Sequence, residues 1–308
     1  MVYFPNFNST HYNWIEVSKD VVSLFGAILT TFGLFLNALS FKTAKFLDKY
    51  NSSMAFFQLL AIWDSIAILQ DGLVNLGGRY FGHDFSTFSP LLCKLYYYHS
   101  ICSSNVANYQ LVALCVDRLT AVKFPIWYRS NGKPILAYWV CFGIFSVNYV
   151  VYCPLLYFYN LINGSCYIVG DVVIINWVIR FHSFFILSGL PFLIILVINI
   201  YFIFYLRQTK KKSSSKQSSD KDRAERRMIV MLISVGFFFL FFTLTTGIGF
   251  ALSIQFSPTN AKEKSLSDLL KIALEIPLIM NSSMNFVFFF LSGKGYRIAF
   301  KKMLRAQF

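Results

Sequence analysis

The segment VVSLFGAILTTFGLFLNALSF (residues 21–41) is a long apolar run without a charged side chain. About 20 such residues in a helix cross the hydrocarbon core of a bilayer, which is about 30 Å thick. Further runs of comparable length follow along the chain, and together they predict spans at residues 21–41, 54–77, 92–122, 135–156, 181–206, 228–254 and 269–291. The sequence therefore predicts an all-α membrane protein that forms a bundle of seven transmembrane helices.

Composition supports this fold class. Of the 308 residues, 56% are hydrophobic and 14% are charged, whereas soluble domains carry about 25% charged residues. Because the spans and their loops fill most of the chain, we expect one membrane domain at residues 21–293, an N-terminal segment at residues 1–20 and a tail at residues 294–308. The N-terminal segment lacks the basic start and apolar run of a cleavable signal peptide, so the first span would direct insertion.

The distribution of basic residues predicts the orientation. Net charge is +14, and most of the 28 basic residues lie in the connections after spans one, three and five and in the tail. Short loops rich in Lys and Arg stay cytoplasmic, which places the N-terminus outside in a multi-pass plasma-membrane protein. The positive charge thus points to membrane lipids as partners and not to nucleic acid.

The connection at residues 207–227 is the most basic part of the chain. It also contains the serines Ser213, Ser214, Ser215, Ser218 and Ser219. One interpretation is a solvated loop that binds anionic lipid headgroups. The other is a segment for partner docking and phosphorylation by a kinase, because phosphate added among basic residues changes both charge and pairing.

After span seven, residues 294–304 predict a short amphipathic helix. Tyr296, Phe300, Met303 and Leu304 recur at helical spacing, and basic residues occupy the remaining positions. Such a helix lies in the membrane interface, here on the cytoplasmic leaflet.

Two of the six cysteines are candidates for a disulfide. By the predicted topology, Cys93 at the outer end of span three and Cys166 in the loop after span four lie in oxidising surroundings without being deep in a helix. The alternative is that both are free thiols. Topology also selects Asn8 and Asn163 as the glycosylation acceptors that face the outside.

Polar residues inside the spans indicate structural or functional sites, because placing a charged side chain in the bilayer costs free energy. Asp64 in span two has Asn37 in span one and Asn285 in span seven at comparable depth. These residues would hold a small cation, with sodium as the candidate, or waters. The alternative is a polar clasp that only fixes packing. The sequence indicates no other cofactor or metal.

Asp117 and Arg118 lie where span three reaches the cytoplasm. Arg118 can pair with Asp117 beside it or with Glu225 at the inner start of span six. Breaking such a pair would free the Arg118 guanidinium to bind a partner protein. The ion pair would then be an element with two states, paired and free. The alternative is a pair of interfacial charges that snorkel to the membrane surface.

Toward the outside, ionisable and aromatic residues of several spans would converge on a cavity. The candidates for ligand binding are Asp71, Tyr96, His99, Arg180 and Glu275. Carboxylates in this position are costly without water or a cationic partner.

Taken together, these residues resemble the rhodopsin-like (class A) family of G-protein-coupled receptors, from about residue 33 to residue 304. The matching features are Asn37 within residues 33–37, Asp64, Cys93 lying 24 residues before Asp117, Trp139, Pro191 and residues 281–285. The resemblance implies a non-enzymatic receptor that binds an extracellular ligand and activates a heterotrimeric G protein. It also implies that arrestin and a kinase act through the third cytoplasmic loop.

Several positions depart from the family pattern. Leu119 follows Asp117-Arg118 where the family usually has Tyr, and Asn-Pro-x-x-Tyr reads NFVFF at residues 285–289, so that the tyrosine hydroxyl and the proline kink are missing. Residues 239–245 of span six contain neither Trp nor Pro, and Gly247 and Gly249 are the candidates for flexibility there.

The ligand class follows from what is present and absent. Ser100 stands where amine receptors carry Asp, and Ile279 stands where opsins carry the retinal lysine. The chain is therefore most similar to invertebrate orphan receptors of the peptide or chemosensory type, and Glu275 with Asp71 would suit a cationic neuropeptide. The alternatives are a chemosensory receptor for a small molecule and, as a minor one, a transporter, although no internal repeat is found.

Overall fold

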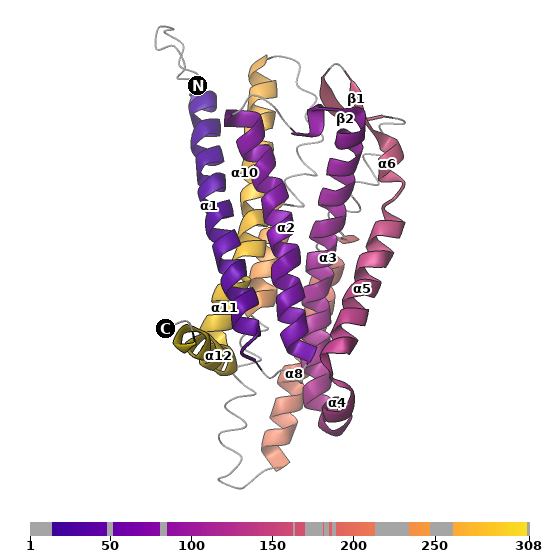
Figure 1. Ribbon diagram of the computed structural model, residues 1–308, viewed down its shortest axis with the longest axis vertical. Helices are drawn as coiled ribbons and strands as arrows, with labels where there is room; N and C mark the ends of the chain where they lie inside the picture. Colours follow the sequence, from indigo (N-terminus) through magenta and orange to yellow (C-terminus); the bar gives the residue numbers. More distant parts are fainter. Residues whose placement is uncertain are drawn as a thin grey trace.

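The computed structural model describes residues 14–47, 52–80, 85–162, 164–169, 181, 185–186, 189–212, 234–246 and 261–306. Within this part of the chain, long helices run side by side along the longest axis (Figure 1). The end that carries Cys93 and a β-hairpin is here called the disulfide end. The opposite end, which carries the short helices α4 and α12, is called the Arg118 end.

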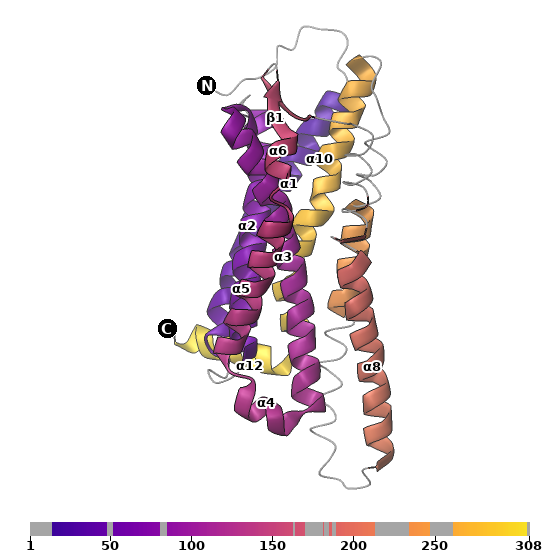
Figure 2. The same cartoon turned by 90° about the vertical axis from the view of Figure 1, so that its right-hand side faces the viewer.

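The long helices are α1 (Trp14–Ala44), α2 (Ser52–Tyr80), α3 (Pro90–Lys123), α5 (Pro134–Val151), α8 (Leu190–Lys212) and α10 (Ala261–Ser283). A further apolar helix covers Ser234–Thr246. The short elements are η1 (Phe85–Thr87), α4 (Pro125–Asn131), α6 (Leu155–Phe158), β1 (Tyr159–Ile162), β2 (Ser165–Ile168), α11 (Asn285–Ser292) and α12 (Lys294–Arg305). The helix α12 lies across the Arg118 end of the long helices (Figure 2).

Local sequence explains where several helices begin. Ser89 caps α3 by accepting a hydrogen bond from the Leu92 amide at 3.1 Å, and Pro90 follows in the first turn. Pro125 and Pro134 occupy the same position in α4 and α5. Proline is tolerated there because the first amides of a helix have no intrahelical acceptor.

Among the described residues, three helices are both long and apolar enough to cross a bilayer, namely α1, Ser52–Gly72 of α2 and Pro134–Phe158. A bent pair, Ile272–Ser283 with Asn285–Leu291, would form a fourth span. The apolar helices Leu190–Tyr205 and Ser234–Thr246 are shorter, and they fall within the predicted spans five and six. The helix α1 begins at Trp14, earlier than the predicted span, and a Glu16–Lys19 ion pair of 3.0 Å extends its first turn.

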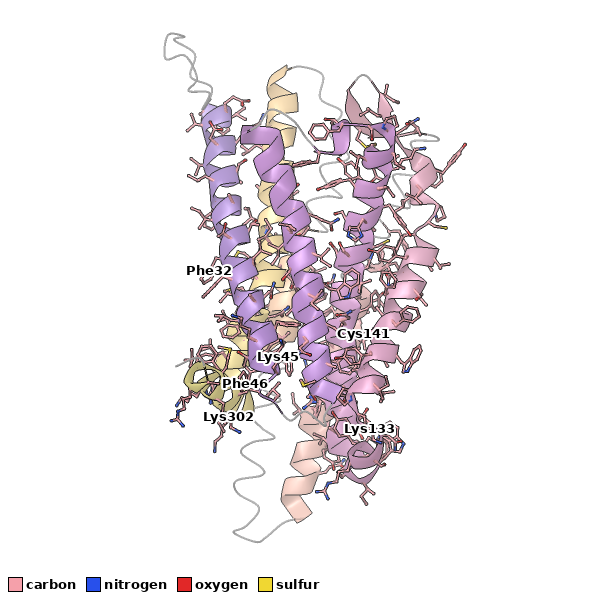
Figure 3. All side chains as sticks on the ribbon, in the orientation of Figure 1. Phe32, Lys45, Phe46, Lys133, Cys141 and Lys302 are labelled. Carbon is pink, nitrogen blue, oxygen red and sulfur yellow. A yellow bond between two sulfur atoms is a disulfide. The ribbon has the colours of Figure 1, made fainter. Side chains whose placement is uncertain are left out.

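The helix α3 is long but polar, because it packs against α2, α5 and α8 and so faces protein on several sides. Its buried polar residues are Ser103, Asn105, Asn108, Gln110 and Asp117. By contrast, α1 and α5 turn large apolar side chains outward. Phe32 on α1 points away from the bundle (Figure 3), and Trp139 on α5 is 66% exposed. Such faces suit contact with lipid.

Glycine allows close helix packing at two places. A Cβ on Gly33 of α1 would lie 3.0 Å from Ser283 Cβ of α10 and 3.0 Å from Ile68 of α2. A Cβ on Gly72 of α2 would lie 3.1 Å from Thr30 Cβ of α1. Small residues at helix contacts let backbones approach closely in membranes.

Span seven is bent by 41° between α10 and α11, although the proline of the family motif is missing. The Asn37 side-chain amide donates to the Ser282 carbonyl at 3.2 Å, and the Ser283 hydroxyl donates to the Ile279 carbonyl. Polar side chains that bond to helix carbonyls often bend helices, and α10 also contains Pro277. The motif proline is absent, as the sequence shows, yet span seven is bent at the break between Ser283 and Asn285.

Candidate functional site

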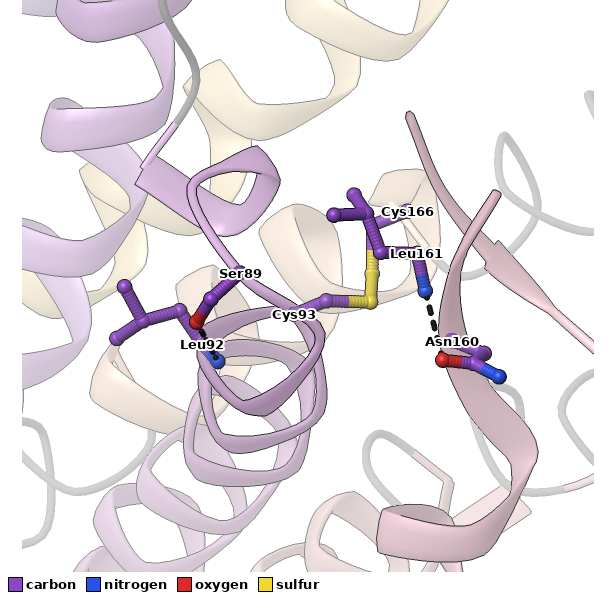
Figure 4. The surroundings of a disulfide bond; sticks show 6 residues. All are labelled: Ser89, Leu92, Cys93, Asn160, Leu161 and Cys166. Carbon is purple, nitrogen blue, oxygen red and sulfur yellow. Dashed lines mark hydrogen bonds between the residues drawn. A yellow bond between two sulfur atoms is a disulfide. The ribbon is translucent and has the colours of Figure 1, made fainter. Parts of the chain in front are cut away.

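The predicted disulfide joins Cys93 of α3 to Cys166 of β2, with 5.7 Å between the Cα atoms (Figure 4). Cys93 is fully buried one turn into α3, next to the Ser89 cap. The strands β1 and β2 pair antiparallel, and Gly164 takes a φ of 75° at their turn, a conformation that favours glycine. The bridge therefore fixes the hairpin to the disulfide end of α3.

A second contact holds the same hairpin. Tyr97, one turn after Cys93, stacks on Tyr159 of β1 with 4.5 Å between ring centroids and 1° between planes. Tyr159 is buried, and burial raises the pKa of its hydroxyl. The hairpin is thus clamped at two points on one face of α3, a contact that the sequence did not reveal.

The predicted ligand-binding residues contact different helices in the structure. The Tyr96 hydroxyl donates to the Gln70 carbonyl of α2 at 3.2 Å. His99 Nδ1 hydrogen-bonds the Tyr149 hydroxyl of α5. Asp71 and Glu275 are half-buried on α2 and α10, which pack against each other. Arg180 lies outside the described residues.

In the middle of the bundle, the predicted polar residues form one hydrogen-bonded chain. Asn285 Nδ2 donates to Asp64 Oδ2 at 2.7 Å, and the Ser282 hydroxyl also bonds the Asp64 carboxyl. Asn37 joins through the Ser282 carbonyl. All four residues are buried, and they come from α1, α2, α10 and α11.

These residues fit a small hard cation. Such ions prefer carboxylate, carbonyl and hydroxyl oxygens. Asp64 supplies a carboxylate that is 2% exposed, and the buried Asn37 Oδ1 has no hydrogen-bond partner. Asp64, Asn37 and Ser282 would hold the ion, which would neutralise a charge that is costly inside a membrane.

At the Arg118 end, Asp117 is the centre of a polar cluster. Arg118 pairs with it at 2.8 Å, from Nη2 to Oδ2. The Tyr128 hydroxyl of α4 donates to the same oxygen at 3.0 Å, and Ser53 of α2 donates at 3.1 Å. Ser52 hydrogen-bonds Asp117 as well. Glu225, the other predicted partner of Arg118, lies outside the described residues.

The sequence reasoning missed Ser52, Ser53 and Tyr128. Tyr128 also accepts from Arg118 Nη2 at 3.1 Å, and the Ser52 amide donates to the Gly132 carbonyl at 2.8 Å. The signal along the chain was Pro125, which predicts that a new helix starts just after α3 but does not place Tyr128 near Arg118. The cluster binds the starts of α2 and α4 to the end of α3.

The helix α4 also presents an apolar surface. Ile126 is 87% exposed, and Phe124 and Trp127 are about half exposed. This α4 patch is defined by Phe124, Ile126 and Trp127. Lys133 lies beside it, whereas Lys302 lies on α12 across the same end of the bundle (Figure 3). Exposed apolar patches with a polar rim mark interaction sites.

The model of the 7 transmembrane receptor (rhodopsin family) matches residues 43–287 of the chain. The chain belongs to the rhodopsin family. No curated protein sequence matches it. The match confirms the predicted seven-transmembrane α-helical bundle of a multi-pass plasma-membrane receptor.

Within this rhodopsin-family receptor, the match covers Asp64, Asp117, Arg118 and Asn285, whereas Asn37 and α12 lie beyond it. The predicted amphipathic helix is present as α12, with Tyr296, Ala299 and Met303 buried. Asn8, Asn163, the serines between residues 213 and 219, Gly247 and Gly249 lie outside the described residues, so the predictions for them stay predictions.

Proposed function

We propose that the receptor binds an extracellular ligand at its disulfide end and activates a heterotrimeric G protein at its Arg118 end. The observation that carries this proposal is the link between the α4 patch and the Asp117 cluster. Tyr128 bonds both Asp117 and Arg118, while Ile126 on the same short helix is exposed for a partner. A change in the ion pair would therefore change the position of the α4 patch.

Arg118 gives the cluster two states. In the structure Asp117 and Tyr128 hold its guanidinium, and we assign this arrangement to the resting state. Release of the guanidinium would present a cation to the G protein. The charge-assisted bonds at Asp117 are strong, so the held and the released guanidinium are two distinct states of the cluster.

For the ligand, we propose a cationic molecule, a neuropeptide or other small cation. Asp71 and Glu275 are carboxylates on helices that pack together, and both are half-buried. The clamped hairpin would cover the entrance to a site between them. A chemosensory receptor for a small molecule is the alternative. A Glu275→Gln variant that responds unchanged to a cationic agonist would contradict the proposed pairing with Glu275.

We further propose an external N-terminus, glycosylation at Asn8 and Asn163, a sodium ion at Asp64, and kinase and arrestin binding through residues 207–227. Each follows from the charge distribution, the acceptor patterns and the oxygen donors described above. Alanine at the serines of that loop would slow desensitisation, and an unchanged rate of signal decay would contradict it.

The coupling proposal is tested by nucleotide exchange on purified G protein added to the full-length receptor in lipid vesicles. We expect the Tyr128→Phe variant, which loses its bonds to Asp117 and Arg118, to raise ligand-independent exchange about fivefold. Adding Ile126→Ala to that variant should return exchange toward the level of G protein alone. Tyr138→Phe, a lipid-facing change on α5, is the matched control.

If neither the wild type nor Tyr128→Phe exceeds the rate of G protein alone with any G protein class, coupling is wrong. Ion or solute flux through the same vesicles without exchange would favour the transporter alternative.

A further inference from the structure

Tyr296 of α12 has a buried hydroxyl that joins α12 to α1. Its oxygen lies 2.9 Å from Ser40 Oγ, and Tyr296 and Ser40 are 4% and 2% exposed. Further along, Thr43 Oγ1 of α1 lies 3.7 Å from the Met303 sulfur. Burial raises the pKa of Tyr296, so the group stays a neutral hydroxyl that both donates and accepts.

The next residue, Arg297, joins α12 to α11. Its Nη1 donates to the Phe290 carbonyl at 3.1 Å and also to the Leu291 carbonyl. The last carbonyls of a helix have no intrahelical donor, and a cation near them is attracted to the negative end of the helix dipole. Consecutive residues of α12 therefore bind two different helices.

The ring of Tyr296 lies within an aromatic cluster from α2 and α11. Its centroid is 5.5 Å from that of Phe57, 5.8 Å from Phe286 and 5.8 Å from Phe289. Phe57 in turn packs edge-on against Phe289 at 4.7 Å. Movement of α11 would disturb these contacts and the Tyr296 hydroxyl together.

We propose that the Tyr296 hydroxyl anchors α11 and α12 to α1 in the resting state, and that breaking its bond to Ser40 frees α11 to move. Phe289 stands where the family motif has Tyr, so this part of α11 has no hydroxyl. Tyr296 supplies one against the same aromatic ring. The hydroxyl that the family motif places in span seven is thus replaced, in this chain, by a hydroxyl on α12.

The helix α11 transmits the effect of this anchor to the Asp64 site. It has eight residues, and the break at Met284 separates it from α10. Its first residue, Asn285, bonds Asp64 at 2.7 Å, and its last turn is bonded by Arg297. Displacement at the α12 end would therefore strain the Asn285–Asp64 hydrogen bond at the other end.

The test measures hydrogen–deuterium exchange of α11 and α12 in the full-length receptor in lipid nanodiscs. Tyr296→Phe and Ser40→Ala should each raise exchange in both helices about fivefold, as expected for the loss of one buried hydrogen bond. The Tyr296 hydroxyl also bonds Thr43, so the double variant should match Tyr296→Phe alone, because that change already removes the hydroxyl that Ser40 bonds. Tyr138→Phe removes a hydroxyl from the lipid-facing side of α5 and should change neither helix.

Unchanged exchange in Tyr296→Phe, additive effects in the double variant, or a rise confined to α12 would each overturn the proposal. The effect on signalling rests on the proposed function. If the receptor couples, Tyr296→Phe should also raise ligand-independent nucleotide exchange about fivefold, and unchanged nucleotide exchange would reject the regulatory role. If the wild type drives no nucleotide exchange, G-protein coupling fails, while hydrogen exchange still decides whether the anchor exists.

Discussion

At the scale of single residues, the Asp117 side chain hydrogen-bonds residues of three helices. It accepts hydrogen bonds from Ser53 of α2, Arg118 of α3 and Tyr128 of α4. A buried carboxylate is stable only when such donors compensate for its lost hydration. Removing one donor leaves the charge partly uncompensated, which is why small changes here are expected to shift the resting state.

Asp64 allows a second test at this scale. If sodium binds at Asp64, replacing potassium chloride by sodium chloride should stabilise the wild type by about 1 kcal/mol, or about 2–4 °C in thermal unfolding. The Asp64→Asn variant should lose this difference, because a neutral amide attracts the ion less strongly. Thermal unfolding in detergent at constant ionic strength measures both. Equal stability of the wild type in the two salts would contradict sodium binding.

At the scale of elements, two glycines in helices provide a matched pair. Gly33→Leu should destabilise the receptor by about 2 kcal/mol, because the new side chain would collide with Ser283 and Ile68. Gly143→Leu on α5 should be neutral or slightly stabilising, since no atom lies within 4 Å of its Cβ position. Thermal unfolding compares the two. Similar losses in both variants would mean that α1 and α10 do not approach closely at Gly33.

The hairpin at the disulfide end has two contacts with α3, so we expect their losses to combine. Removing the bridge with Cys93→Ser and Cys166→Ser should cost about 2–5 kcal/mol. Tyr159→Ala should destabilise the hairpin further. Loss of the stack on Tyr97 alone should cost about 1 kcal/mol, in addition to the free energy lost because less apolar area is buried. The rate of proteolysis of the hairpin and the thermal unfolding temperature measure these losses.

Tyr157→Ala, which alters an exposed side chain two residues away from Tyr159, serves as the control. If the cysteine changes alone make the hairpin as sensitive to proteolysis as the combined variant, the stack of Tyr97 on Tyr159 does not stabilise it.

At the scale of the whole molecule, orientation is the central prediction. An epitope at the N-terminus should be accessible on intact cells, and an epitope after α12 should be accessible only after permeabilisation. Asn8→Gln and Asn163→Gln should each reduce the mass shift that a glycosidase removes. Basic loops that are labelled from outside the cell would reverse the topology.

Much of the fold could be predicted from local pattern. Long apolar runs predicted the helices, because a segment inside lipid must satisfy its own backbone groups. Cys93 and Cys166 could be paired because topology left them as the two cysteines in oxidising surroundings. Asp64 and Asn285 could be placed at one depth because helix rise is constant. None of these inferences required the side-chain directions.

Other features depended on side chains from separate helices meeting. The Tyr128–Asp117 bond needs α4 to turn back onto α3, and the Tyr296–Ser40 bond joins residues that are 256 positions apart. The bend of span seven was not predicted, and next to its break the Asn37 side chain of α1 donates to the Ser282 carbonyl. Hydrophobicity and charge act along the chain, so the membrane bundle and its charge asymmetry could be predicted from the order of the residues alone. A hydrogen bond depends on distance and direction in space, so the hydroxyls that hold the helices together are identified only when the helices are packed.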